Sequence, residues 1–173
     1  MELDEILSDY TIKFNGRALE LYTDCKEYLN IKIAFSSTAI PHLLGLDKMI
    51  SVPTTRPKKI NKLIKDKKYT IDMVKRDVAY GDIKSRIDNY SFIEKVFTNY
   101  QYCSFIPNKT DPHRLGKVEV VLSENLSNKE MVILGLVATS QGYFTPATLH
   151  VRNIPNSFST IKRYKIKNVV WLQ

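Results

Sequence analysis

The sequence has 173 residues, of which 43% are hydrophobic, so it is long enough for one compact domain over residues 1–173 with a real core. Its formal net charge of +8 favours a polyanionic partner, either nucleic acid or an anionic membrane surface, although a basic domain without such a partner is equally compatible. No apolar run reaches the roughly 20 residues of a membrane span, and no signal peptide is evident, so we expect a cytoplasmic protein with no membrane partner.

The first third of the chain is predicted to be mainly helical. Apolar residues recur at steps of three and four over residues 1–27, which predicts an amphipathic helix that Asn15-Gly16 could interrupt. Alternation over Tyr28–Phe35 predicts a short strand, and a Ser/Thr turn follows it. Cys25 and the distant Cys103 match no metal or redox spacing, which favours free thiols and leaves one disulfide open.

A short helix is expected over residues 40–50, which contain Pro-His-Leu-Leu-Gly-Leu-Asp-Lys from Pro41 to Lys48. Its leucines form a buried side, so His42 can be held against the core while it stays reachable. A proton-transfer group requires that placement, and an ordinary core histidine can share it. Lys48 would lie at the helix end, where the helix dipole favours a cation in any case.

A basic amphipathic helix is predicted over residues 56–68, where seven basic residues accompany one acid. Its candidate phosphate contacts are Lys58, Lys59 and Lys62, although such a face is often only solvated. A short helix over residues 70–78 and a break at Gly81 come next. One longer helix is expected over residues 82–99, with Arg86 on its apolar side or in an ion pair with Asp82 or Glu94.

The pattern changes after residue 99 from helical to strand-like. A short apolar run covers residues 102–106, and a polar loop over residues 109–115 carries His113. Strands are predicted over residues 118–122, 131–138, 143–151 and 160–172. Their short links predict an antiparallel meander of four to five strands. The fold class is therefore α+β, with a mainly helical part (1–99) packed on a C-terminal sheet (100–173).

Several chemistries have no support in the sequence. It contains no GxxxxGK(S/T), GxGxxG, HExxH or paired CxxC motif, no tight cluster of carboxylates and no nucleophile elbow. We therefore expect neither a metal nor a cofactor. Metal-free RNA cleavage is still possible, because it needs only a proton acceptor, a proton donor and positive charge around the phosphorus that the 2′-OH attacks.

Residues of these types occur in suitable places. His42 and Lys48 share the short helix, Arg86 lies on the longer one, and Tyr143, Thr148 and His150 lie on a late strand. A strand period of two places Thr148 and His150 on one face, together with Pro146.

The order of these elements, with the His-Leu-Leu-Gly-Leu core and Tyr143-Phe144-Thr145-Pro146-Ala147-Thr148, resembles a phage and mobile-element family of predicted RNases. That family is grouped with the barnase–EndoU–colicin–RelE nucleases, and the resemblance covers about residues 15–170. It implies an α+β fold and metal-independent endoribonuclease or toxin activity, for which an antitoxin or immunity protein would be the partner. By the same resemblance, the catalytic residues would be His42, Lys48, Arg86 and Thr148.

Substrate contacts are expected from a wider set of residues, namely Tyr143, His150, Lys58, Lys59, Lys62 and Tyr164. The alternative is a non-catalytic module that binds nucleic acid or protein through residues 56–68 and 162–165. A weaker alternative is a protein-interaction role in which the acidic N-terminus covers the basic surface. Thr148 could also be an ordinary strand residue, and His42 could simply stabilise its helix.

Overall fold

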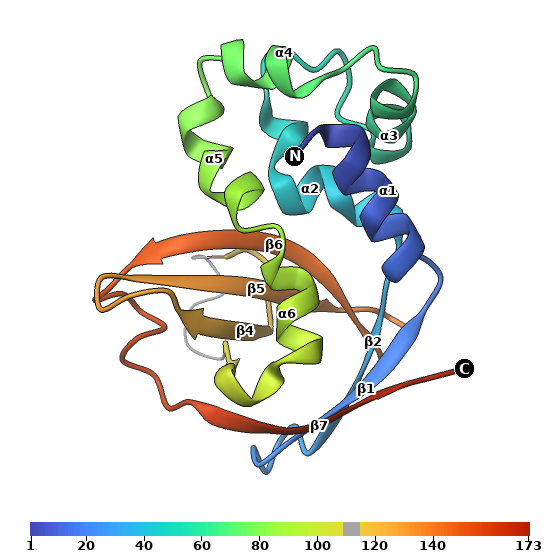
Figure 1. The fold of residues 1–173 in the computed structure, drawn as a ribbon. Coiled ribbons are helices and arrows are strands. Elements are labelled where there is room, and N and C mark those ends of the chain that lie inside the picture. Colours follow the sequence, from blue (N-terminus) through green and yellow to red (C-terminus); the bar gives the residue numbers. More distant parts are fainter. Residues whose placement is uncertain (109–114) are drawn as a thin grey trace.

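A computed structural model describes residues 1–108 and 115–173 (Figure 1). His113 lies outside the described residues, as does most of the loop predicted at 109–115. The α-helices are α1 (Leu3–Lys13), α2 (Ile40–Leu44), α3 (Pro57–Lys65), α4 (Ile71–Arg76), α5 (Tyr80–Asp88) and α6 (Phe92–Thr98). The strands are β1 (Ala18–Thr23), β2 (Asn30–Ala34), β3 (Ser104–Pro107), β4 (Val120–Asn125), β5 (Glu130–Ala138), β6 (Phe144–Asn153) and β7 (Tyr164–Trp171). Short 3-10 turns are η1 (Ser37–Ala39), η2 (Leu46–Lys48) and η3 (Tyr100–Tyr102).

The strands of the described residues form one closed barrel in the order β1-β2-β6-β5-β4-β3-β7, and β7 pairs with β1. All neighbours are antiparallel except β2 and β6, which are parallel through Ile33 and Phe144. The mixed α+β class is therefore confirmed. The prediction of four to five strands is too low, because the barrel has seven strands and two of them come from the N-terminal region.

The predicted helix over residues 1–27 is correct only as far as α1. Gly16, with φ of +78°, turns the chain, and Ala18–Thr23 then runs as β1 between β2 and β7. Leu19 and Leu21 are fully buried on its inner face. Six residues of mixed apolar sequence can satisfy either a helical or a strand period, and here pairing with two neighbouring strands decides.

The single helix predicted over residues 82–99 is divided into α5 and α6. Between them the Asn89 side chain donates to the Ser85 carbonyl at 2.9 Å, and the Tyr90 hydroxyl donates to Asp9 at 2.8 Å. Asparagine competes with the helical backbone for such hydrogen bonds, so it favours a helix end. Gly81 was expected to break a helix, but it lies inside α5.

The helices α1–α5 form a layer above β6, and α6 lies between β6 and β7 in the view of Figure 1. Of these, α2 and α5 contact β6 directly. A salt bridge of 2.7 Å from Lys95 to Glu124 ties α6 to β4. Helix packing on the sheet is therefore partly as predicted, because α1 packs instead on α3.

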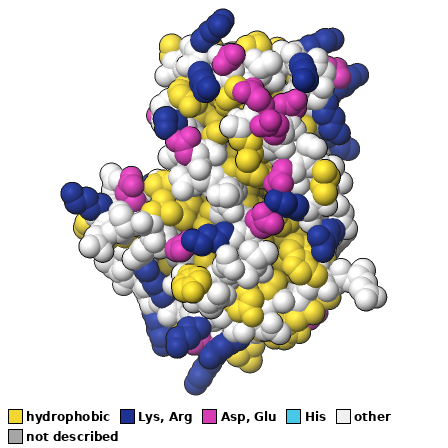
Figure 2. Space-filling model, viewed as in Figure 1, with side chains coloured by type: hydrophobic (Ala, Val, Ile, Leu, Met, Phe, Trp, Pro, Cys, Tyr) yellow, Lys and Arg dark blue, Asp and Glu magenta, His cyan; other side chains and the backbone are white. Residues whose placement is uncertain are grey.

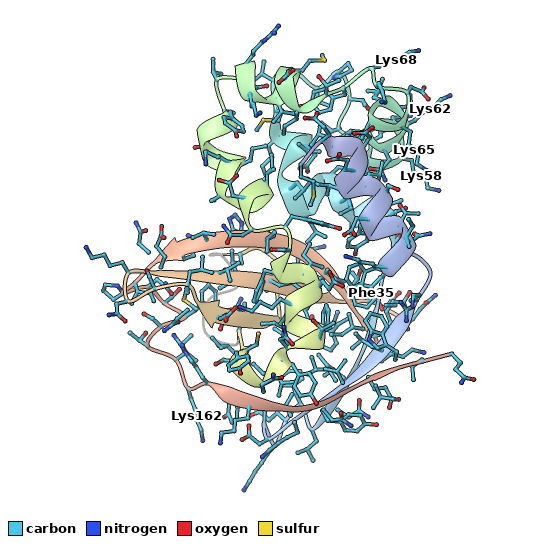
Figure 3. The ribbon with its side chains drawn as sticks, in the orientation of Figure 1. Phe35, Lys58, Lys62, Lys65, Lys68 and Lys162 are labelled. Carbon is cyan, nitrogen blue, oxygen red and sulfur yellow. The ribbon has the colours of Figure 1, made fainter. Side chains whose placement is uncertain are left out.

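One hydrophobic core fills the inside of the barrel and continues into the helical layer. Phe35, just after β2, lies where these parts meet, and its ring contacts Phe14, Phe97 and Trp171 at 5.2–5.7 Å between centroids (Figure 3). Cys25 and Cys103 are both buried and unpaired. Among the described residues, no helix has the length and apolar character to cross a membrane.

Candidate active site

A cavity of about 550 Å³ opens where the helical layer meets the outer face of β6. His42 on α2 and Lys48 on η2 form one side, and Thr148, His150 and Arg152 on β6 form another. The segment before β4 closes it with Leu115, Gly116, Lys117 and Val118. With Val137 of β5, four separate parts of the chain therefore converge on one concave, basic site.

A β-bulge directs the β6 side chains into this cavity. Thr148 pairs with Gly135 of β5, whereas Leu136 pairs with Pro146, so Ala147 is the extra residue. The bulge reverses the alternation at this point, and the prediction that Pro146 shares a face with Thr148 and His150 is therefore wrong. Pro146 lies opposite Leu136, which belongs to the inner core.

Gly135 allows β5 and β6 to bring Thr148 this close. A Cβ on Gly135 would lie 2.7 Å from Thr148 Cγ2 and 2.9 Å from Val118 Cγ2. Contacts this short do not occur for real Cβ atoms, so any larger residue would displace the threonine or Val118. The position of Thr148 in the cavity wall therefore depends on a glycine in the neighbouring strand.

His42 is held by a carboxylate. Its Nδ1 lies 2.9 Å from Oδ2 of Asp47, and about half of the imidazole side chain (51%) stays exposed. Burial alone would raise the pKa of Asp47, but hydrogen bonding to His42 and the charge of Lys48 outweigh it, so the pKa is lowered. An ionised carboxylate can only accept, so Nδ1 carries the hydrogen, and in the neutral form of the ring the lone pair is on Nε2.

Arg86 lies behind this pair and not in the cavity wall. It is 5% exposed, and its Nη1 would be 3.2 Å from a Cβ at Gly45, the left-handed residue that ends α2. Burial lowers the pKa of Arg86, and the nearby charge of Asp47 opposes that change. Arg86 therefore supplies fixed positive charge close to the carboxylate. The ion pair with Asp82 or Glu94 that the sequence allowed is not formed.

His150 is in a strongly positive environment. Burial, followed by the positive charges of Arg86, Arg152 and Lys48, lowers the pKa of His150 to about 3. The ring is therefore neutral at physiological pH. It can donate or accept one hydrogen bond in the cavity, but it cannot serve there as a cationic acid.

Other residues expected to contact substrate lie away from the cavity. Lys58 and Lys62 on α3 point outward from the helical layer, together with Lys65 and Lys68 (Figure 3). Lys59 is exposed on the same helix. Tyr143 precedes β6, and Tyr164 begins β7, where its ring lies 5.0 Å from the Lys162 ammonium.

The face shown in Figure 2 has basic side chains over α3 and at the opposite end near β7, with further basic and acidic side chains between them. No histidine of the described part of the chain is visible on that face, so the half-exposed His42 is reached from another side.

Three residues of the site were not predicted from the sequence, two that line the cavity and the carboxylate that pairs with His42. Arg152 could have been found, because it continues the period of two from Thr148 and His150. Asp47 lies inside the conspicuous Pro41–Lys48 segment, but only the turn at Gly45 shows that it faces His42. Nothing local distinguishes Lys117. Over residues 1–108 and 115–173, no group of three or more His, Cys, Asp or Glu could hold a metal ion.

A comparison with family models gives one match over residues 2–173, described as phage-barnase-EndoU-colicin E5/D-RelE-like nuclease 4. No curated protein and no solved structure matches the chain. The family match covers the whole cavity and both layers that form it. The chain therefore belongs to the phage barnase–EndoU–colicin E5/D–RelE-like nuclease 4 family.

Proposed function

We propose that the protein is a metal-independent endoribonuclease that cleaves RNA by attack of the 2′-OH on the adjacent phosphorus. The observation that carries this proposal is the His42–Asp47 pair, with a free Nε2, beside a cavity lined by Lys48, Lys117 and Arg152. Membership in a nuclease family supports hydrolysis or transfer at a phosphodiester. The 2′-OH requirement would make the enzyme specific for RNA without a separate RNA-reading motif.

In this mechanism Nε2 of His42 accepts the proton of the 2′-OH. The new bond joins the 2′ oxygen to phosphorus, and the bond from phosphorus to the 5′ oxygen breaks. The products are a 2′,3′-cyclic phosphate and a free 5′-OH. Asp47 holds the ring in the required tautomer and stabilises the imidazolium that forms, and the buried charge of Arg86 lies close to that carboxylate.

Lys48 is the group best suited to protonate the leaving 5′ oxygen, because it lies in the same wall as His42 and is cationic. Lys117 and Arg152 offset the charge that develops on the phosphorane, and the Thr148 hydroxyl and neutral His150 can hydrogen-bond its oxygens. The exposed α3 cations Lys58, Lys59 and Lys62 would contact RNA beyond the cavity.

We further propose that this activity serves as a toxin of a phage or mobile element, made in the cytoplasm and neutralised by an antitoxin or immunity protein. The family description, which names phage nucleases and colicins, supports this role. Expression of the wild type should stop growth of a bacterial host, whereas His42→Ala should not. Equal growth with both forms would contradict the toxin role and leave the enzymatic proposal standing.

The enzymatic proposal is tested by incubating the purified protein with total RNA and tRNA in excess EDTA. We expect cleavage with 2′,3′-cyclic phosphate ends and no cleavage of DNA. His42→Ala should lower the rate at least a hundredfold, the usual contribution of a general base. Asp47→Asn should lower it by up to about a hundredfold, because the ring loses its orientation.

The matched control is Asp66→Asn, an exposed acid at the end of α3 and outside the cavity, which should cleave like wild type. The proposal fails if no RNA is cleaved under any condition, or if His42→Ala leaves the rate unchanged. In that case binding without cleavage becomes the function to test.

A further inference from the structure

Arg152 borders two cavities and not only the one that His42 faces. The second cavity, of about 130 Å³, is lined by Arg152, Asn156, Ser157 and Phe158. It lies at the far end of β6 from Thr148, beyond His150. A substrate strand that leaves the first cavity past Arg152 would therefore enter a second hollow.

The loop that forms this hollow is firmly held. The Asn156 side chain accepts the backbone N–H groups of Phe158 and Ser159 at 2.8 and 3.1 Å, and it donates to the Asn153 carbonyl at 2.7 Å. Phe158 is buried in a separate cluster on the outer face of the sheet. The Ser157 hydroxyl makes no hydrogen bond with the described residues and lines the hollow. The site is therefore preformed and retains a free donor.

No acidic side chain of the described residues forms a salt bridge with Arg152. Its Nε is buried without a hydrogen-bond partner within the described ranges. Its neighbours Arg86, Lys48 and His150 add no negative charge, and Asp47 is already bonded to His42. Like charges gathered this closely repel each other, so the arrangement is most stable with an anion bound.

We propose that Arg152 and Ser157 form a second phosphate subsite, which binds the RNA phosphate next to the one that is cleaved. Residues 150 and 152 lie about 7 Å apart along β6, at two strand steps, which suits successive phosphates of an extended single strand. This inference rests on the proposed function for the identity of its ligand. It adds that the enzyme distinguishes substrates by a flanking phosphate that takes no part in the reaction.

The test uses a dinucleoside monophosphate that the wild type cleaves, together with the same compound carrying an added 3′- or 5′-phosphate. We expect one of the two added phosphates to raise kcat/KM on the order of tenfold, mainly through KM, as one charge-assisted hydrogen-bonded contact does. In Arg152→Gln the ratio of kcat/KM with and without the added phosphate should fall close to one. Ser157→Ala should reduce it by a smaller factor.

The matched control is Arg163→Gln, which removes the same charge from an arginine that lines neither cavity. It should keep the full gain. The subsite is refuted if the wild type shows no gain from either added phosphate, or if both arginine variants lose it equally.

A wild type that cleaves nothing would refute the proposed function but not the subsite. Calorimetric titration with 2′-deoxy dinucleotides, with and without the terminal phosphate, then decides. Tighter binding of the phosphorylated form by wild type, lost in Arg152→Gln, supports the subsite. Equal binding of both forms overturns it.

Discussion

At the scale of single residues, the protonation of His150 is set by its surroundings. The ring lies on β6 between Thr148 and Arg152, and two further cations approach it from the helical layer. Burial is the largest cause of its lowered pKa, and the surrounding positive charges act in the same direction. His150 is therefore a neutral polar group in a cationic site, which suits a hydrogen bond to phosphate oxygen better than proton transfer.

This lowered pKa predicts a dependence of stability on pH. The unfolded histidine binds a proton near pH 6.5, whereas the folded one does so only near pH 3. The contribution of His150 to the free energy of unfolding is therefore complete above about pH 6.5 and is lost as the pH falls toward 3. We expect the free energy of unfolding, measured in urea, to fall from pH 7 to pH 5, and to fall less in His150→Asn. The same fall in both proteins would contradict the assignment.

At the scale of elements, the α2–η2 turn positions both His42 and its carboxylate. Gly45 ends α2 with φ of +76°, and this left-handed residue turns the chain so that Asp47 faces back toward His42. The turn also packs tightly on α5, because a Cβ at Gly45 would lie 2.7 Å from Ile83 Cγ2. Glycine at position 45 thus allows both the left-handed turn and the close packing against Ile83.

We expect Gly45→Ala to destabilise the protein by more than the backbone strain of about 1–2 kcal/mol that a left-handed alanine costs. Gly142→Ala is the matched control, because Gly142 has φ of +80° and nothing within 4 Å of its Cβ position. Urea unfolding of both variants separates strain from the contact with Ile83 and Arg86. Equal losses of stability would show that the turn has room for a side chain.

At the scale of the whole molecule, the excess positive charge is spread over separate surfaces. One lies in the cavity, one on the outward face of α3, and one near the start of β7 (Figures 2 and 3). A long RNA could contact more than one of them, whereas a dinucleotide fits only the cavity.

Charge reversal at Lys58, Lys59 and Lys62 should therefore weaken binding of a 2′-deoxy oligonucleotide and reduce its salt dependence by about 2 in log–log slope. Cleavage of a dinucleoside monophosphate should stay unchanged, because α3 lies outside the cavity. The comparison variant reverses Lys162, Lys165 and Lys167 near β7. If that variant alone loses affinity, the RNA passes along β7 and not along α3.

The sequence by itself determined the features that depend on local interactions. Pro41 lies in the first turn of a short helix and Gly45 ends it. The late strands β4 to β7 lie close to their predicted positions because their patterns and turns are local. The nuclease family could likewise be predicted, since the segment around His42 is distinctive. His42, Lys48 and Thr148, predicted from the sequence as catalytic residues, line one cavity, and their chemical roles remain predictions.

Only the tertiary structure decided the features that depend on distant parts of the chain. Ala18–Thr23 is a strand because β2 and β7 satisfy its backbone, and the parallel contact of β2 with β6 closes the barrel. The bulge at Ala147 and the glycine opposite Thr148 set which side chains face the cavity. Arg86 lies behind the site, where the sequence predicted a catalytic residue, and Arg152 lines the cavity without having been predicted. Both differences have the same physical reason. Burial and the surrounding charge depend on contacts that a strand or helix pattern does not contain.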